Sequence, residues 1–295
     1  MSTRNLSARA CALSLLLAAA LPAGAQSTGL DAHARSSIIY FNPDPLGPTQ
    51  RLQNAHSIDY TGPTFAPQTA AGNVAVGGAT ASGQSSAYFG TLGAYAAVTV
   101  VNPGGLDPTG TRQSVADGWS TWTDAVTITK LGAPTGTPID IRVDLVIHVA
   151  NVSVARSDWA ITVAQVSFTT HGAVWCLSQA SPNSYGCGAD TLPLTVGRND
   201  ISFVRHTFTG VQGFAATLTA STVVESYSNT VAFSSSALAD AMNTAHSYYS
   251  VLSPDTTLQS ASGHVYAPVP EPAAWVSLLV GLGFFGLRLR RRSSH

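Results

Sequence analysis

The strongest constraint on the fold is the alternation of apolar and polar residues along the middle of the chain. In the run 139–154, Ile141 and Val143 share one parity, while Arg142 and Asp144 take the other. Successive side chains of a β-strand point to opposite faces, so this pattern predicts a strand with one buried and one solvated face. Similar runs occur at 87–101, 119–130, 158–171, 201–208, 214–227, 229–234 and 257–266.

Clusters of glycine, proline, asparagine and aspartate separate these runs, as at 102–105 and 132–134. Such clusters are typical of turns between short strands. The pattern predicts an all-β fold, an antiparallel β-sandwich of jelly-roll-like type, over residues 72–267. Only 236–245 has the composition of a short helix, and we interpret it as a strand connection. The proline-rich residues 26–71 are expected to form a partly ordered arm on this sandwich.

Residues 1–25 have the features of a secretory signal peptide. Two arginines precede the apolar run 10–21, and Ala23 and Ala25 supply the small side chains that signal peptidase accepts. An uncleaved membrane anchor is the alternative, but this run is too short to cross a hydrocarbon core of about 30 Å as a helix. We therefore predict signal peptidase as a partner and cleavage after Ala25.

Two cysteines, Cys176 and Cys187, remain once the signal peptide is removed. An even count in an exported protein predicts a disulfide, here closing a short loop rich in turn residues. A metal pair and a reactive thiol are the alternatives, and only His171 lies near enough in sequence to add a ligand. We expect the disulfide, with no metal and no cofactor.

The C-terminal residues 268–295 combine three features in a fixed order. These are Pro270, Glu271 and Pro272, then the apolar stretch 273–287, then the basic cluster Arg288, Arg290, Arg291 and Arg292. This arrangement resembles the PEP-CTERM sorting signal. The resemblance implies that an exosortase-type enzyme processes the chain, and that its host is a bacterium that makes exopolysaccharide.

The physical properties of this segment agree with the resemblance. Proline disfavours helix in the residue before it, so the peptide ahead of residue 273 is expected to be extended. The apolar stretch 273–287 would span about 22 Å as a transmembrane helix, with the arginines in the cytoplasm. We expect an inner-membrane-anchored precursor that is later found at the cell surface or outside the cell. A tail anchor that is never cut is the alternative.

Charge and motifs narrow the function only coarsely. Residues 26–269 carry eight basic and fourteen acidic side chains, a formal charge of −6, which argues against nucleic acid as a partner. The common hydrolase, metalloprotease, nucleotide and calcium motifs are absent from the sequence, and Glu225 is the only glutamate before the tag. We predict a non-enzymatic structural or binding role associated with exopolysaccharide or biofilm. A carbohydrate-binding or adhesive module and a polysaccharide-modifying hydrolase are the alternatives.

Five residues form a possible ligand face. Arg142, Asp144 and His148 share one face of a predicted strand, a grouping able to bind an anion or a sugar. Trp119 and Trp122 are three residues apart, so in a strand they point to opposite faces and one of them is expected to be open to a sugar ring. Solvated cross-strand charge pairs and core packing are the alternative roles of these residues.

Overall fold

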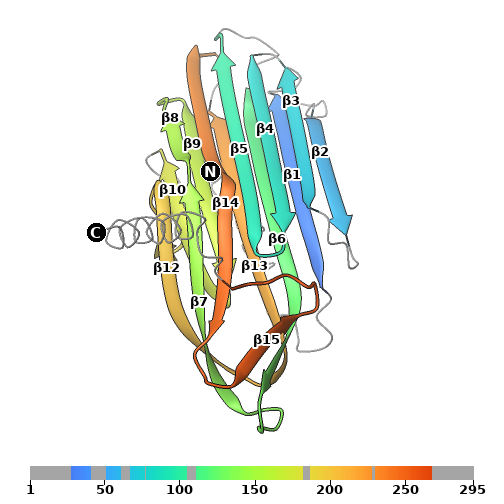
Figure 1. The fold of residues 1–295 in the computed structure, drawn as a ribbon. Helices are drawn as coiled ribbons and strands as arrows, with labels where there is room; N and C mark the ends of the chain where they lie inside the picture. The colour runs from blue at the N-terminus through green and yellow to red at the C-terminus, as the bar shows by residue number, and fades with distance from the viewer. Residues whose placement is uncertain are drawn as a thin grey trace, which may run out of the picture.

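The computed structural model describes residues 28–40, 51–60, 67–76, 78–104, 111–181, 187–227 and 230–267. Within these ranges every regular element is a strand, and the strands form two sheets that pack one over the other (Figure 1). Sheet A runs in the order β11-β10-β9-β13-β6-β1-β2, with β15 also paired to β6. Sheet B runs in the order β12-β7-β14-β5-β4-β3, with β8 also paired to β14.

All pairs are antiparallel except β10 with β11, so the predicted all-β class and antiparallel pairing are confirmed. The strands of sheet A are β1 (Gly29–Tyr40), β2 (Arg51–Tyr60), β6 (Thr111–Lys130), β9 (Ala160–Thr170), β10 (Ala173–Ala180), β11 (Leu192–Pro193), β13 (Gly210–Ser226) and β15 (Thr256–Ser260). Those of sheet B are β3 (Gln68–Val76), β4 (Ala79–Tyr88), β5 (Thr91–Asn102), β7 (Pro138–Val149), β8 (Asn151–Ala155), β12 (Gly197–Phe208) and β14 (Phe233–Val251).

The core lies between the sheets because inward positions alternate with outward ones. In β9, every second residue from Ala160 to Thr170 is buried, and the residues between them are partly exposed. The inward set of β7 includes Ile141, Val143 and Leu145, as the sequence pattern predicts. The predicted run 139–154 is therefore two strands, β7 and β8, which pair one after the other with the same strand β14.

The chain pairs as a ribbon that folds back and forth between the sheets. β5 pairs with β14 in sheet B, β6 pairs with β13 in sheet A, and β7 pairs with β12 in sheet B. Two stretches of chain, β5 to β7 and β12 to β14, thus run antiparallel to one another while both change sheets twice. This folded ribbon supports the jelly-roll-like interpretation, which remains a prediction.

The stretch 26–71, expected to form an arm on the surface, instead supplies strands to both sheets. β1 lies between β6 and β2, and β3 forms the last strand of sheet B. Leu30, Ala32 and Ile38 of β1 are buried in the core. The prediction of an arm relied on the proline-rich composition, but the prolines lie between β1, β2 and β3 and not within these strands.

The stretch 236–245, read as a strand connection with some helical character, belongs to the long strand β14. Ala237, Ala239 and Ala241 point inward and are buried. The register of β14 against β5 shifts between Ala241 and Ala245, where the backbone N–H of Met242 donates to the carboxylate of Asp240 at 3.0 Å. Alanine fits either structure, so the local composition favoured a helix while pairing with β5 and β7 decides for a strand.

Candidate functional site

The last described residues form a strap across the edge of the sandwich. We use the name strap for residues 261–267, which leave β15 in sheet A and reach sheet B (Figure 1). At one end the N–H of Ala261 donates to the carbonyl of Ala125 at 2.8 Å, and at the other the N–H of Tyr249 donates to the carbonyl of Tyr266 at 2.9 Å. The strap thus joins the two sheets next to the point where the C-terminal segment begins.

A buried carboxylate, that of Asp124 on β6, holds the strap in place. Its Oδ2 accepts hydrogen bonds from the hydroxyls of Ser260 at 2.5 Å, Ser262 at 2.6 Å and Tyr266 at 2.8 Å. Its Oδ1 accepts a fourth from the N–H of Ser262 at 3.2 Å. Burial, and then the charge of Asp124, raise the pKa of Tyr266, so its phenol stays a donor. Four donors satisfy this carboxylate without a cation.

A groove of about 650 Å³ opens beside the strap. It lies between β15, the end of β14 and the strap, and is lined by Tyr249, Leu258, His264, Val265 and Ala267, among others. Burial lowers the pKa of His264, although Asp124 acts in the opposite direction. His264 therefore faces the groove as a largely neutral imidazole, and the groove adjoins the start of the C-terminal tag.

A second polar group, partly buried between the sheets, joins His171, Arg205 and Tyr249. Burial, and then the nearby guanidinium of Arg205, lower the pKa of His171 to about 3. The Arg205 guanidinium donates to Nδ1 of His171, so the proton of the neutral ring must sit on Nε2, which lies 3.1 Å from the Tyr249 hydroxyl. The rings of Phe214 and Tyr249 lie 5.4 and 5.5 Å from that of His171. A neutral imidazole therefore connects the guanidinium of Arg205 with the hydroxyl of Tyr249 between the two sheets.

The predicted ligand residues on β7 face solvent on the outer side of sheet B. Nε of Arg142 lies 2.9 Å from Asp144 and 3.0 Å from the hydroxyl of Ser202. His148 is exposed on the same face but pairs in register with Arg198, which bonds Asp200 instead. The structure thus gives this face solvated ion pairs between residues two apart on one strand.

The two predicted tryptophans point to opposite faces of β6, as expected. Trp122 is fully buried and packs against Tyr266 and Tyr249, with ring centroids 5.3 and 6.4 Å away. Trp119 lies on the outer face of sheet A, where its indole stacks on the ring of His33 at 4.6 Å. Trp122 therefore belongs to the core, and Trp119 is partly open to solvent. The five predicted ligand residues do not come together.

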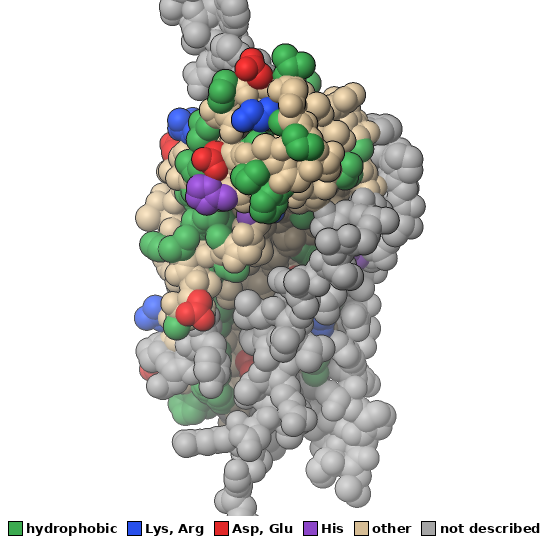
Figure 2. Space-filling model, turned by 90° about the horizontal axis from the view of Figure 1, so that it is seen from below, with side chains coloured by type: hydrophobic (Ala, Val, Ile, Leu, Met, Phe, Trp, Pro, Cys, Tyr) green, Lys and Arg blue, Asp and Glu red, His purple; other side chains and the backbone are tan. Residues whose placement is uncertain are grey.

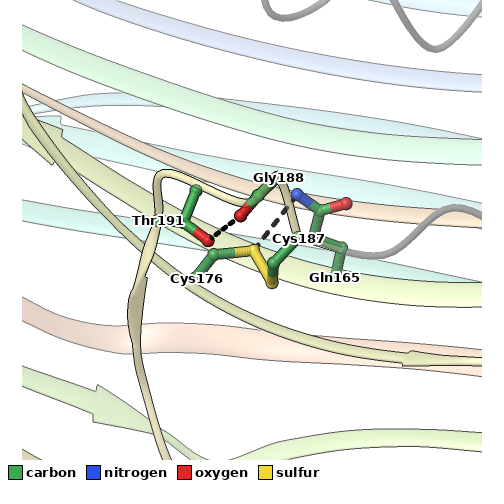
Figure 3. Close-up of a disulfide and its surroundings, with 5 residues drawn as sticks. All are labelled: Gln165, Cys176, Cys187, Gly188 and Thr191. Carbon is green, nitrogen blue, oxygen red and sulfur yellow. Dashed lines mark hydrogen bonds between the residues drawn. A yellow bond between two sulfur atoms is a disulfide. The ribbon is translucent and has the colours of Figure 1, made fainter.

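The predicted disulfide between Cys176 and Cys187 is confirmed (Figure 3). The side-chain amide of Gln165 on β9 donates to the Cys176 sulfur at 3.3 Å. Beyond Cys187, the Thr191 hydroxyl donates to the carbonyl of Gly188 at 2.7 Å and closes a turn. Cys176 pairs with the outward-facing Ser167, so the disulfide joins Cys187 to the outer surface of β10.

The end of the molecule at the turns after β6, β12 and β14 presents apolar side chains to solvent. Leu131, Phe208, Val211 and Leu252 are all more than half exposed. Figure 2 looks onto this end and shows apolar side chains with only a few charged ones among them. Hydrogen bonds between the turns, such as that from Thr209 to the carbonyl of Pro134 at 2.8 Å, hold this apolar surface in shape.

The predicted terminal sites lie outside the described residues. They are Ala23, Ala25, Pro270, Glu271, Pro272, Arg288, Arg290, Arg291, Arg292 and the apolar stretch 273–287. In the part of the chain that the structure describes, no helix is long and apolar enough to cross a membrane. In the same part, no group of three or more His, Cys, Asp or Glu side chains is placed to hold a metal ion.

Sequence reasoning missed the residues that hold the strap. Asp124 shares its parity with Trp122, Val126 and Ile128, so the alternation in β6 already marked it as an inward-facing carboxylate. Nothing local to Ser260 or Ser262 indicates that they turn back toward it. The contact between His171 and Arg205 also has no sequence signal, because His171 lies in the turn after β9 of sheet A and Arg205 lies on β12 of sheet B.

Comparison with known proteins places one part of the chain. Residues 268–292 match the PEP-CTERM protein-sorting motif. No curated protein matches the chain. A solved structure of the infectious bursal disease virus Gx strain is similar at 13% identity over 89% of this chain and 69% of that chain. Its TM-score is 0.11, too low to support any argument about the fold.

Proposed function

We propose that this PEP-CTERM motif-bearing chain is an exported surface protein, made as a membrane-anchored precursor and processed at its C-terminal tag by an exosortase-type enzyme. The match at residues 268–292 is the observation that carries this proposal. We propose further that the β-sheet body then serves in the exopolysaccharide layer, in a structural or binding role. The signal peptide, the membrane helix and the cleavage belong to the same proposal.

The strap supports this proposal because it ends the folded body close to the tag. Tyr266 is 6% exposed and lies two residues before the match begins. Residues 267–272 separate Tyr266 from the apolar stretch at Ala273, and six extended residues reach at most about 22 Å. In the anchored precursor, the body is therefore held near the bilayer, and the processing enzyme works beside the strap and its groove.

A non-enzymatic role is supported by the partners of the carboxylates. The buried carboxylate of Asp124 is satisfied by its four donors from the strap and its neighbours. On the outer face of sheet B, Asp140, Asp144 and Asp200 are bonded to histidine or arginine side chains. A glycoside hydrolase needs two carboxylates that converge on one substrate, one of them able to give up a proton.

The chain offers a matched pair of variants to test sorting, since Glu271 and Glu225 are its two glutamates. In the native host, we expect Glu271→Ala to accumulate as full-length precursor in the membrane fraction and Glu225→Ala to be processed normally. Mass spectrometry of the surface or released protein should give a C-terminus that lacks the arginine cluster. Released protein that still ends in Arg-Arg-Ser-Ser-His would refute processing.

A further inference from the structure

We propose that the outer face of sheet A carries a binding trough for an uncharged glycan. Its floor consists of outward-facing residues on β9 and β13, which are Gln165, Ser167, Thr169, Thr217, Thr219 and Ser221. This inference rests on the proposed binding role of the body and names the ligand class and the site. We call this surface the trough.

The register of β9 and β13 makes the floor a regular grid. Thr219 pairs with Ser167 in the middle of the floor. The pair of Thr217 and Thr169 lies on one side of them, and the pair of Ser221 and Gln165 lies on the other. Neighbouring strands lie about 4.8 Å apart, and residues two apart on a strand lie about 6.7 Å apart. The inward neighbours Leu218 and Phe168 are fully buried, which fixes the floor residues on the solvent side. The floor therefore presents hydroxyl and amide groups at spacings set by the backbone.

Part of this hydrogen-bonding capacity is unused within the described residues. There, the hydroxyls of Thr219, Ser167 and Thr169 have no side-chain partner, whereas Thr217 bonds Thr121 at 3.0 Å and Ser221 bonds Asp117 at 2.7 Å. Hydroxyls both donate and accept, as do the hydroxyls of a sugar. The middle of the floor is thus open to a polar ligand.

Trp119 forms one wall of the trough. Its ring and that of His33 are nearly parallel, at 10°, and their centroids are 4.6 Å apart, which is close to the spacing between neighbouring strands. Because the two residues pair across β6 and β1, both rings must stand upright on the sheet. One face of the indole packs on His33, and the other looks toward Thr219 on β13. An aromatic face beside hydroxyl groups suits the apolar face and polar rim of a sugar ring.

The disulfide forms the opposite wall. Cys176 pairs with Ser167 and so takes the outward parity, yet it is only 4% exposed. The disulfide places Cys187 on this side of β10, and the amide of Gln165 on the floor bonds the Cys176 sulfur (Figure 3). Three strand spacings separate β6 from β10, so the trough is about 14 Å wide from backbone to backbone. Trp119 and the disulfide therefore stand on either side of a polar floor.

The absence of charge on the floor selects the class of ligand. None of its six side chains ionises, whereas the outer face of sheet B carries Arg142, Asp144, Arg198 and Asp200. Two carboxylates, those of Asp31 and Asp117, lie at the rim beside His33 and Arg35. A polyanion would meet these carboxylates and the net negative charge of the exported part, so we assign the trough to a neutral polysaccharide.

The test uses the full chain, purified in detergent from a host without the processing enzyme. Binding of dextran, cellohexaose and maltohexaose is measured by titration, with alginate as a polyanionic probe. We expect at least one neutral glycan to bind, and Trp119→Ala to weaken that binding about tenfold or more. Thr219→Val keeps the shape of the floor and should weaken it roughly three- to tenfold. Trp159→Ala is the control, since Trp159 is 46% exposed and lies before β9, outside the trough.

Several results would overturn the trough. They are no neutral glycan bound by the folded wild type, unchanged binding in Trp119→Ala, equal weakening in Trp159→Ala, or tighter binding of alginate. Circular dichroism of each variant separates lost binding from lost folding, and Thr219→Val serves if Trp119→Ala does not fold. Sorting is judged separately by the mass of the C-terminus, so failure of the trough leaves the sorting proposal standing.

Discussion

Two regions of one core differ sharply, and the strand β6 passes through both. In the first half of β6, the inward residues are Ser114, Ala116, Gly118 and Ser120, all small. In the second half, they are Trp122, Asp124, Val126 and Ile128. We call these the small-residue region and the aromatic region. The two are buried to the same degree, yet they hold the sheets together by different means.

In the small-residue region the backbones of the two sheets touch. A Cβ added at Gly118 would overlap the carbonyl oxygen of Gln84 on β4, and one added at Gly83 would overlap that of Asp117 on β6. Hydrogen bonds also cross between the sheets, as from the Ser36 hydroxyl to the carbonyl of Gly72 at 2.5 Å. Close approach thus replaces side-chain volume, which leaves this region no room for a larger residue.

In the aromatic region, large rings fill the space between the sheets. The ring centroids of Phe214 and Tyr249 lie 4.5 Å apart, and those of Tyr249 and Tyr266 lie 5.2 Å apart. Tyr266 belongs to the strap, so residues after the last strand complete the core here. The small-residue region therefore depends on close approach of the two backbones, while the aromatic region depends on a short segment held by Asp124.

The largest effect is expected from a methyl group in the small-residue region. Gly118→Ala places a Cβ against the carbonyl oxygen of Gln84 and the backbone of Tyr95, neither of which can rotate away. We expect the free energy of unfolding to fall by more than about 4 kcal/mol, or the variant not to fold at all. Thermal unfolding and the yield of soluble protein measure this. Gly188→Ala is the control, because its nearest neighbour would be Thr191 Cγ2 at 3.9 Å. A melting temperature for Gly118→Ala within about 2 °C of wild type would show that the sheets do not touch here.

The next largest effect is expected from Asp124→Ala in the aromatic region. The variant leaves three hydroxyls and one N–H without their acceptor, at a cost of about 3 to 5 kcal/mol. Hydrogen exchange should rise in residues 261–267 well before it rises in β6. Asp200→Ala removes an exposed carboxylate and should change stability by no more than about 0.5 kcal/mol. Unchanged exchange in the strap would mean that Tyr266 alone holds it.

The aromatic region should also make stability depend on pH through His171. Its pKa is about 3 in the folded protein and 6.5 when unfolded, so the unfolded state binds the proton first as pH falls. The contribution of His171 to the free energy of unfolding is therefore fully present above pH 6.5 and is lost as the pH falls toward 3. At pH 5 the loss is about 2 kcal/mol. Arg205 and Tyr249 face the ring, and neither titrates in this range.

His171→Asn should flatten this decline between pH 6.5 and 4, because asparagine tolerates the left-handed φ of 50° at this position and does not titrate. The measurement is urea unfolding at a series of pH values. His206→Asn is the control, since His206 is exposed beside Asp140, and it should leave the slope in place. If the pH dependence of stability flattened equally in both variants, His171 would not be its cause.

The smallest effect is expected from Tyr266→Phe. It removes one of the four hydrogen bonds to Asp124 but keeps the ring against Trp122, so we expect a loss of about 1 kcal/mol by thermal unfolding. Tyr227→Phe alters a tyrosine that is 59% exposed and should not change the melting temperature. A loss as large as that of Asp124→Ala would show that Tyr266 accounts for the whole effect of the strap.

The sequence predicted what depends on neighbouring residues. The alternation gave the strands, the even cysteine count gave the disulfide of Cys176 and Cys187, and the terminal pattern gave the sorting motif. It failed where a choice depends on distant residues. The stretch 236–245 became part of β14, and β1 arose within the expected arm, because each pairs with a strand far away in the chain.

The candidate sites show the same division. Trp119 was recognised as one of two tryptophans on opposite faces. Only the structure tells which of them is outside, and only the structure places β13, β9 and then the disulfide on one side of it. Arg142, Asp144 and His148 share a face as predicted, and the structure shows that their neighbours bind them as ordinary ion pairs or leave them in solvent. The proximity of Trp119 and Cys176 has no local signal, since 56 residues separate them.

The sequence by itself determined that this chain forms strands, that Cys176 and Cys187 can pair, and that its tag carries a sorting motif. Those properties follow from the period of two along a strand, from loop length and from a linear peptide pattern. Only the tertiary structure decided which sheet each strand joins, that Gly118 marks a contact of two backbones, and that Asp124 holds the strap. Alternation tells which side of a strand is buried but not what it faces, because the partner across the core is chosen by the packing of the whole chain.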